Sequence, residues 1–406
     1  MVLGIVAEYN PFHNGHLYHL LKSKDEAKAS SVIAIIGGNF TQRGEPSLVD
    51  KWTKAEMALA NGADLVIELP TLYSVSSAEN FADGAIKILN SLKIVDHISF
   101  GAETDDLSKL NILANTLYKE PKEYKDLLSE ALKSGTSFPK AREKALVNYL
   151  NDKNYSMILS SPNNILGIEY LKALKKYCSR IKPICIKRKD AGHLTLEYKG
   201  EVASATAVRD FVRRNRMKEV KTYTTPATYT ILEEEIKKGH FITDMSPFEN
   251  IIIYNLRSMS LEQIANLPDV SEGLEHAIKK AANSCNTIDE FINIVSSKRY
   301  TQTRIRRILL YSLLKITKKD IELSKKITPY VRVLAFNETG KHLLSKISKA
   351  NPRLSIITSV KKFKDINLNK SLQTMLNKDI YATNVYTLGY RRDSWSNLDY
   401  TKKVIN

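Results

Sequence analysis

Two histidines, His13 and His16, stand three residues apart just after the first apolar segment of the chain. On the first turn of a helix this spacing lets both imidazoles point at one phosphate, and a helix N-terminus already favours anions. Gly15 removes a side chain where a flat ring such as adenine could approach the backbone. Attack on the α-phosphate of a nucleotide builds negative charge that imidazole and amide donors stabilise. These residues indicate adenylyl transfer by positioning and electrostatics, although an ordinary surface turn can carry the same letters.

The elements around this turn follow one pattern, in which apolar strands alternate with helices. The predicted strands cover residues 2–7, 31–38, 63–70, 94–101 and 182–188, and predicted helices cover 50–61 and 77–92. This alternation predicts an α/β fold with a doubly wound parallel sheet and right-handed crossovers. Such sheets bind ligands at the carboxyl ends of their strands. The histidine turn, the loop after Gly37 and Gly38, and the segment from Gly101 should therefore converge at one edge.

Two further stretches belong to this predicted catalytic domain, residues 1–216. Residues 105–153 are charged and helical in pattern, which predicts a helical insertion. After the fifth strand, Ser204 and Thr206 open a predicted helix, and Arg209 follows one turn later. Hydroxyls at a helix start either cap it or bind phosphate, and these three residues are candidates for a phosphate loop. Asp190 and His193, just before them, are further candidates in the same loop.

The net charge of +17 is unevenly distributed along the 406 residues. Residues 201–406 carry 35 lysines and arginines against 21 aspartates and glutamates, whereas the first 200 residues are almost neutral. Such an asymmetry favours a polyanionic partner for the second half, with a lysine-rich solvated surface as the alternative.

The second half is predicted to be a helical linker at 217–250 and a basic, mainly helical (α+β) region at 251–406, with short strands at 331–336 and 354–360. Arginines beside apolar stripes and aromatics could contact phosphates or stack unpaired bases, although packing is the commoner role. The candidates for contact with RNA are Arg304, Arg306, Arg307, Lys361, Lys362, Arg391 and Arg392.

The three cysteines, Cys178, Cys185 and Cys285, are too few and too scattered for a disulfide framework or a zinc site. No apolar run approaches the roughly 18 residues of a membrane span. A cytoplasmic protein is therefore expected, without a membrane or an obligate protein partner, and no protein metal site is predicted.

The motif His13-Asn14-Gly15-His16 is similar to the HxGH signature of the nucleotidyltransferase superfamily, which shares a Rossmann-like fold with class I aminoacyl-tRNA synthetases. The longer strings EYNPFHNGHLYH at 8–19, GNFTQRGEP at 38–46 and SPNNILG at 161–167 resemble the bacterial tRNA(Met) cytidine acetate ligases. That resemblance extends over most of the chain. It implies an ATP-dependent ligase that activates acetate as acetyl-adenylate and acetylates the wobble cytidine of elongator tRNA(Met) to N(4)-acetylcytidine.

The resemblance also implies site residues. His13 and His16 would be catalytic, as stabilisers of the pentavalent α-phosphate and of the pyrophosphate leaving group. ATP would be bound by Ala7, Glu8, Tyr9, Asn10, Pro11, Phe12, His13, Asn14, Gly15, His16, Leu17, Tyr18, His19, Leu20, Gly101, Asn163 and Arg188. The segment with Ser204, Thr206 and Arg209 resembles the Ser/Thr-x-x-Arg element that binds the β- and γ-phosphates.

The acetate pocket has a weaker signal. Asn39, Gln42 and Arg43 lie on the loop predicted to face the histidine turn, and a carboxylate needs a donor pair such as an arginine and an amide. Mg²⁺ would arrive with the ATP phosphates rather than in a protein cage. Two alternatives remain at this stage: a small-molecule nucleotidyltransferase of cofactor biosynthesis, and a non-catalytic RNA-binding protein. The basic second half argues against the first, and the intact His13, Gly15 and His16 argue against the second.

Overall fold

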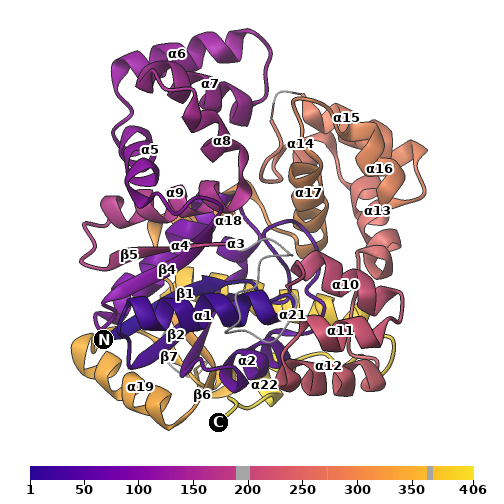
Figure 1. Ribbon diagram of the computed structural model, residues 1–406. Helices are drawn as coiled ribbons and strands as arrows, with labels where there is room; N and C mark the ends of the chain where they lie inside the picture. The colour runs from indigo at the N-terminus through magenta and orange to yellow at the C-terminus, as the bar shows by residue number, and fades with distance from the viewer. Residues whose placement is uncertain (189–201, 272, 364–368) are drawn as a thin grey trace.

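A computed structural model describes residues 1–188, 202–271, 273–363 and 369–406 of the protein (Figure 1). The candidates Asp190 and His193 lie outside these residues. Within them, one seven-stranded sheet forms, in the order β5-β4-β1-β2-β3-β6-β7. Its strands are β1 Val2–Ala7, β2 Ser31–Gly37, β3 Leu65–Leu69, β4 His97–Ala102, β5 Lys182–Lys187, β6 Val331–Phe336 and β7 Ile356–Ile357.

The first five strands are parallel to one another, and helices cover both faces of their sheet. Because side chains alternate across a strand, Leu3 and Ile5 pack with Leu20 on one face, whereas Val6 packs on the other. The first face carries α1 Asn14–Glu26 and α2 Lys51–Ala60, and the second carries α4 Ala78–Leu92 and α9 Pro162–Lys176. This is the doubly wound α/β sheet that the sequence predicted, and the five predicted parallel strands are confirmed.

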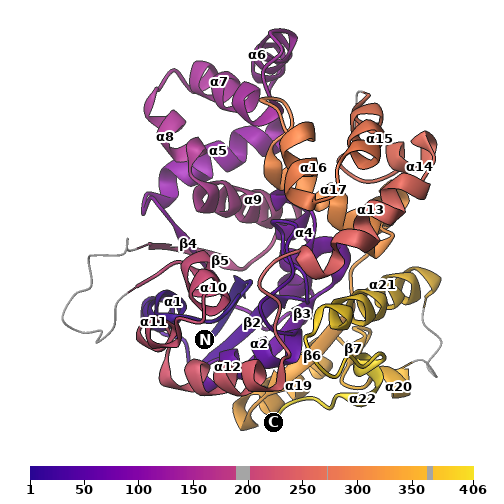
Figure 2. The same cartoon turned by 90° about the vertical axis from the view of Figure 1, so that its right-hand side faces the viewer.

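Two helical groups project from the sheet (Figures 1 and 2). The predicted insertion consists of α5 Leu107–Lys119, α6 Lys122–Lys133, α7 Phe138–Leu150 and α8 Asn154–Ser160. A second group consists of α13 Glu249–Ser258, α14 Leu261–Ala265, α15 Leu274–Ser284, α16 Ile288–Val295 and α17 Gln302–Leu314. In chain order, β5 and this second group are separated by α10 Ala205–Arg213, α11 Met217–Tyr223, α12 Pro226–Lys238 and the short η1 Ser246–Phe248.

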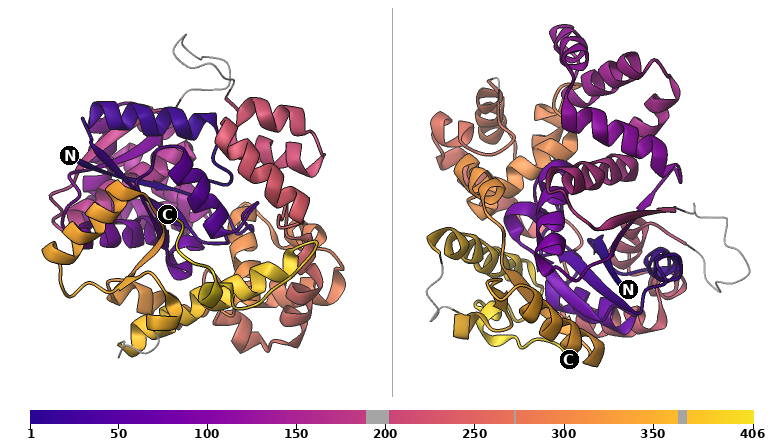
Figure 3. Two further views of the ribbon diagram at one scale, coloured as in Figure 1. Left: turned by 90° about the horizontal axis from the view of Figure 1, so that it is seen from below. Right: turned by 90° about the vertical axis from the view of Figure 1, so that its left-hand side faces the viewer.

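The end of the chain returns to the sheet (Figure 3). Strand β6 pairs antiparallel with β3, and β7 extends the sheet beside β6. The described parts of the two halves therefore share one sheet. The remaining helices are α3 Thr71–Ser74, α18 Lys318–Lys326, α19 Glu338–Ala350, α20 Val360–Phe363, α21 Lys370–Tyr386, η2 Thr387–Gly389 and α22 Leu398–Thr401.

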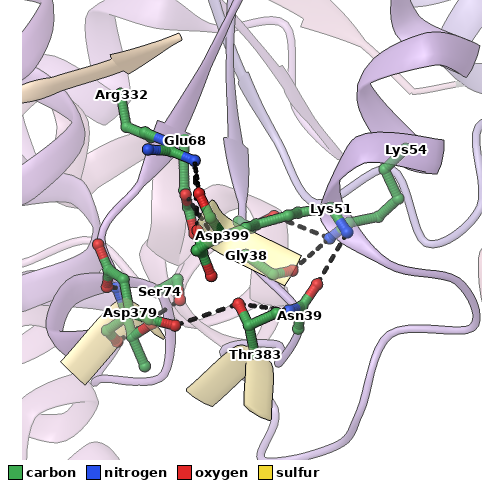
Figure 4. Close-up of polar contacts among 12 residues, drawn as sticks. Gly38, Asn39, Lys51, Lys54, Glu68, Ser74, Arg332, Asp379, Thr383 and Asp399 are labelled. Atoms are coloured by element: carbon green, nitrogen blue, oxygen red, sulfur yellow. Dashed lines mark hydrogen bonds and ion pairs between the residues drawn. The ribbon is translucent and has the colours of Figure 1, made fainter. Parts of the chain in front are cut away.

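A buried cluster of charges fastens this returning segment to the sheet (Figure 4). Lys51 Nζ lies 2.9 Å from both carboxylate oxygens of Glu68 and 2.8 Å from Oδ1 of Asp399, and all three side chains are almost fully buried. Arg332 Nη2 approaches the same Asp399 oxygen at 3.3 Å. Burial alone would lower the pKa of Lys51, but the two carboxylates outweigh it and the pKa is raised. Lys51 is therefore a charged hub that joins residues more than 300 positions apart.

Candidate active site

The predicted histidine turn lies at the point where the order of the parallel strands reverses. Strand β1 is flanked by β2 on one side and by β4 on the other, and the chain crosses over β1 to reach β4. A crevice opens beyond the carboxyl ends of the strands at such a switch point, and it is where open α/β sheets bind ligands. Residues 8–13 connect β1 to α1 there, so the fold brings His13 and His16 to this edge.

The two imidazoles hold each other and the start of α1 in place. His13 is the N-cap residue, and its Nδ1 accepts a hydrogen bond from Gly15 N at 3.0 Å. In return, Nδ1 of His16 accepts from His13 N at 3.3 Å. The ring centroids are 3.8 Å apart. Because each Nδ1 accepts a hydrogen bond from a backbone N–H, each neutral ring carries its own proton on Nε2. The turn therefore presents two imidazole Nε2–H donors side by side.

Both imidazoles are neutral at physiological pH. Burial, reinforced by the positive charge of Arg188, lowers the pKa of His13 to about 3 and lowers the pKa of His16 well below its ordinary value. The rings of Tyr9 and Phe12 pack against His16, with centroids 5.0 Å and 5.6 Å away, and remove water from it. Neutral donors stabilise developing charge on phosphate oxygens without supplying a proton.

Gly15 makes this arrangement sterically possible. A Cβ at this position would lie 2.9 Å from Cε1 and 3.1 Å from Nδ1 of His13. Any side chain would therefore push the ring off the Gly15 N–H that it caps. Gly101, at the end of β4, is less restricted, because a Cβ there would make ordinary contact with the Arg188 side chain at 3.4 Å. The structure thus gives Gly15 a positioning role besides the ligand approach that the sequence suggested.

His19, one turn further along α1, is partly buried and contacts the β4 side of the sheet. Its Nε2 lies 3.1 Å from Ser99 Oγ, and Ser99 in turn contacts Ser23 at 2.7 Å. Burial and the charge of Arg188 lower the pKa of His19 to about 4. Arg188 itself is exposed after β5, and its charge acts on all three imidazoles. An exposed cation beside neutral donors is suited to an anionic ligand.

The asparagines at the start of α9 organise the neighbouring strand end. Asn163 Nδ2 donates to Glu103 Oε1 at 2.6 Å, and Asn164 N donates to Oε2 of the same carboxylate at 2.9 Å. Asn164 Oδ1 accepts from Glu103 N at 2.8 Å and Thr104 N at 3.1 Å. The predicted Asn163 therefore reaches the site edge paired with Glu103. Asn164 is not among the predicted site residues, because an asparagine in the first turn of a helix usually interacts only locally.

The Ser204–Arg209 segment contacts the histidine turn through its arginine. Arg209 Nη1 donates to Asn10 O at 3.0 Å, and Nη2 lies 3.3 Å from Glu45 Oε2 and 3.4 Å from Thr206 Oγ1. Ser204 caps α10, since its hydroxyl accepts from Ala207 N at 3.1 Å. The fold thus brings this segment to the predicted edge, with Arg209 bound to protein groups.

The loop at 38–47 contains one interior and two peripheral candidates for the acetate pocket. Asn39 is 4% exposed, and its amide group bonds to Thr383 Oγ1 at 3.1 Å and to Lys51 N at 2.8 Å, so it supports the buried cluster. Gln42 N donates to Glu8 Oε1 at 2.7 Å, and Arg43 is exposed. Lys54, beneath the loop, donates to the carbonyls of Gly37 and Gly38 at 2.8 Å and 2.6 Å.

Glu45 on this loop joins the site to the helical group. Its carboxylate binds Arg209 through one oxygen and Arg306 of α17 through the other. Gly44 adopts φ +79° against α17, and a Cβ there would lie 2.6 Å from backbone atoms of Arg306 and Arg307. Glu45 is not among the predicted site residues, because no local pattern marks a glutamate whose two partners are 164 and 261 residues away.

The predicted RNA-contact residues fall into two groups. Arg304 donates to Asp269 O and Ser271 Oγ at 2.9 Å, and Arg307 binds Asp269 Oδ2 at 2.8 Å. Arg306 forms an ion pair with Glu45, so all three arginines have protein partners within the described residues. Lys361, Lys362, Arg391 and Arg392 are exposed.

This geometry agrees with comparisons with known proteins. The chain belongs to the HIGH nucleotidyl transferase family, whose model matches residues 1–399. Within that class it belongs to the tRNA(Met) cytidine acetate ligases: it is 47% identical over 406 residues to the tRNA(Met) cytidine acetate ligase of Thermoanaerobacter sp. strain X514 and 48% identical over 405 residues to that of Caldanaerobacter subterraneus subsp. tengcongensis. These alignments cover at least 99% of each chain.

Solved structures show the same likeness. Thermotoga maritima TmcAL bound with alpha-thio ATP matches with a TM-score of 0.93 and 33% identity, over 100% of this chain and 99% of that one. The apo form of the same protein matches with a TM-score of 0.94 and 34% identity. The protein is thus a ligase of this family, and the family prediction from the sequence is confirmed.

In the described ranges, no three His, Cys, Asp or Glu side chains gather as a metal site. In the same ranges, no helix is both long and apolar enough to cross a membrane.

The buried histidines predict a pH dependence of stability. The pKa values of His13, His16 and His19 are lower in the folded chain than the ordinary 6.5, so below that pH the unfolded chain binds more protons. The contribution of the neutral histidines to the free energy of unfolding is therefore full above pH 6.5 and decreases as the pH falls below it. We expect a loss of about 2–4 kcal/mol between pH 7.5 and 5.5, measured by denaturant unfolding.

The His19→Gln variant is the control, because it keeps a polar tip near Ser99 but removes one titrating group. Its loss of stability over the same pH interval should be smaller than that of the wild type. A free energy of unfolding that stays constant between pH 7.5 and 5.5 in the wild type would contradict neutral burial of the histidines.

Proposed function

We propose that this ligase joins acetate to elongator tRNA(Met) in two steps. An acetate oxygen attacks the α-phosphorus of ATP, which forms acetyl-adenylate and releases pyrophosphate. The N4 amine of the wobble cytidine then attacks the acetyl carbon, loses a proton, and releases AMP to leave N(4)-acetylcytidine. The observation that carries the proposal is the pair of neutral Nε2–H donors at the switch point of the sheet.

The proposed roles of the residues follow from their positions. His13 and His16 donate to oxygens of the α-phosphate and of the departing pyrophosphate, where negative charge grows. Arg188 adds positive charge to the same region. Residues 7–19 with Gly101 and Asn163 line the ATP site, whereas Leu20, which the sequence also suggested, packs in the core with Leu3 and Ile5. Ser204, Thr206 and Arg209 lie on the path of the β- and γ-phosphates. Holding acetate in line with the α-phosphorus supplies the rest of the rate enhancement.

Mg²⁺ fits this scheme as an ion bound to the ATP phosphates, since it usually keeps several waters and needs few protein ligands. The three cysteines are unpaired, which suits a reducing cytoplasm, where the tRNA substrate also resides. We further propose that residues 1–216 carry the chemistry, that 217–250 link the two parts, and that 251–406 serve tRNA binding.

For acetate we propose Arg43 and the side-chain amide of Gln42 as the donor pair. Arg43 is exposed, whereas the Asn39 side chain is buried and already bonded to Thr383. The test is acetate-dependent exchange of pyrophosphate into ATP, which reports the first step without tRNA. Arg43→Ala should raise the KM for acetate about tenfold, with little change in the KM for ATP.

Arg353→Ala, at another exposed arginine, is the matched control and should leave both constants unchanged. An unchanged acetate KM in Arg43→Ala would refute the role of Arg43. Absence of acetate-dependent exchange in the wild type would refute the adenylate step itself.

A further inference from the structure

A hollow of about 430 Å³ lies where α10, α11 and α12 meet the segment after η2. In Figure 1 these three helices and the yellow end of the chain lie side by side, and Arg391 N donates to Gly239 O at 3.0 Å across the contact. The residues that line the hollow come from both segments and are Val212, Arg213, Asn215, Met217, Ile236, Lys237, Gly239, Phe241, Arg391 and Arg392. We call it the basic hollow.

All charged side chains that line the basic hollow, among the described residues, are cations: Arg213, Lys237, Arg391 and Arg392. Arg213 pairs with Asp210 at 2.6 Å and Lys237 with Glu233 at 2.8 Å, but these are pairs along single helices, with the cations 54% and 69% exposed. Such exposed pairs hold their partners weakly. Arg213 and Lys237 can therefore turn to a phosphate at little cost.

The floor of the basic hollow is apolar. Val212 and Phe241 are buried beneath it, and the guanidinium of Arg391 lies over the Phe241 ring at 4.4 Å from its centroid. The ring holds this guanidinium at the floor of the hollow, and a guanidinium plane is a surface on which unpaired bases stack. A cationic rim around an apolar floor suits a nucleic-acid strand, which carries phosphates outside and bases or ribose inside.

The basic hollow is also connected to the catalytic turn through one helix. Asn14 Nδ2 of the turn donates to Thr222 O near the end of α11, and Met217 at the other end of α11 lines the hollow. Five residues of α-helix span roughly 7.5 Å. Phe211 and Tyr223 stack at 5.5 Å, which ties α10 to α11. A strand that delivers a nucleotide to the turn would therefore pass this surface within a few nucleotides.

We propose that the basic hollow binds the RNA backbone next to the nucleotide that enters the active site. The inference rests on the proposed function and adds Arg213 and Lys237 to the candidates for tRNA contact. It also separates Arg391 and Arg392 from Arg304, Arg306 and Arg307, which the fold uses for its own contacts.

The test compares two double variants that remove the same charge at different places. R391Q/R392Q removes two exposed arginines from the basic hollow, and K140Q/K144Q removes two exposed lysines from α7, which lies apart from α12 in Figure 1. Binding of a tRNA(Met) transcript is measured by fluorescence anisotropy at several salt concentrations. Acetate-dependent pyrophosphate exchange without RNA is measured in parallel.

We expect R391Q/R392Q to raise the Kd for tRNA at least tenfold and to reduce the slope of log K against log salt by roughly 1 to 2. K140Q/K144Q should change both by much less, and neither variant should change the exchange reaction. Unchanged Kd and slope in R391Q/R392Q, or equal losses in both variants, would overturn the assignment. Binding of heparin, a polyanion that is not a nucleic acid, is a further comparison. If R391Q/R392Q weakens binding of heparin but not of tRNA, the assignment is also overturned. Absence of acetate-dependent exchange in the wild type would refute the proposed function instead. The tRNA-binding data would still show whether the basic hollow binds RNA.

Discussion

Replacing His16 by asparagine is expected to lower the rate of acetyl-adenylate formation by about 10²–10³-fold, because one preorganised donor to the transition state is removed. The Oδ1 atom of asparagine lies near the position of Nδ1, so the backbone contact from His13 N is kept. The Nε2–H donor at the tip of the ring is lost. Single-turnover kinetics with ATP and acetate measure the effect on the chemical step.

His16→Gln is the matched variant, since its amide nitrogen reaches the position of Nε2 but offers no acceptor at Nδ1. It should retain at least tenfold more activity than His16→Asn if the donor at the tip carries the effect. Equal rates for both variants, or a faster His16→Asn enzyme, would show that the imidazole acts through its backbone contact only. Folded-state stability should change little in either variant, which unfolding curves can verify.

Replacing Lys51 by methionine is expected to lower the free energy of unfolding by about 3–5 kcal/mol. The reason is that Glu68 would be left buried without its cation, while Asp399 would keep only Arg332. Removing one member of a buried charge cluster costs more than the cluster itself is worth, because the remaining charges have no water to solvate them. Denaturant unfolding followed by circular dichroism measures the loss.

Two comparisons make this prediction specific. In Lys51→Met/Glu68→Gln the uncompensated carboxylate is also removed, so we expect a partial recovery of stability relative to Lys51→Met. Lys22→Met breaks the exposed pair with Glu26 on α1 and should change stability by less than about 1 kcal/mol. If Lys51→Met is as stable as Lys22→Met, the buried cluster does not fasten the end of the chain to the sheet.

The parallel sheet and the histidine turn were predictable because their signals are local. Each buried strand is a short apolar run, and residues 2–7 and 182–187 fall within the predicted bounds. Gly15 and the spacing of His13 and His16 mark the turn in four consecutive residues. What the sequence could not supply is the reciprocal capping of the two rings, which fixes the Nε2–H form of each imidazole.

The long-range contacts were not predictable from patterns. The sequence indicated a strand at 331–336 but not that it would pair antiparallel with β3. The apolar pattern of a strand does not specify which other strand it pairs with. Arg304, Arg306 and Arg307 look like solvent-facing cations in a helical pattern, and their partners Asp269 and Glu45 lie far away in the sequence. Lys51 likewise looks like a surface lysine next to a helix cap, although it is completely buried.

The most direct test of the central claim is transfer of labelled acetate to purified tRNA(Met) with ATP, followed by nucleoside analysis. We predict label in N(4)-acetylcytidine at the wobble position, a strict requirement for ATP, and one AMP and one pyrophosphate for each acetyl group. The initial rate of labelling should be lower by about 10²–10³-fold with His16→Asn under the same conditions. Unlabelled tRNA, with transfer of a nucleotide to a small acceptor instead, would contradict the account.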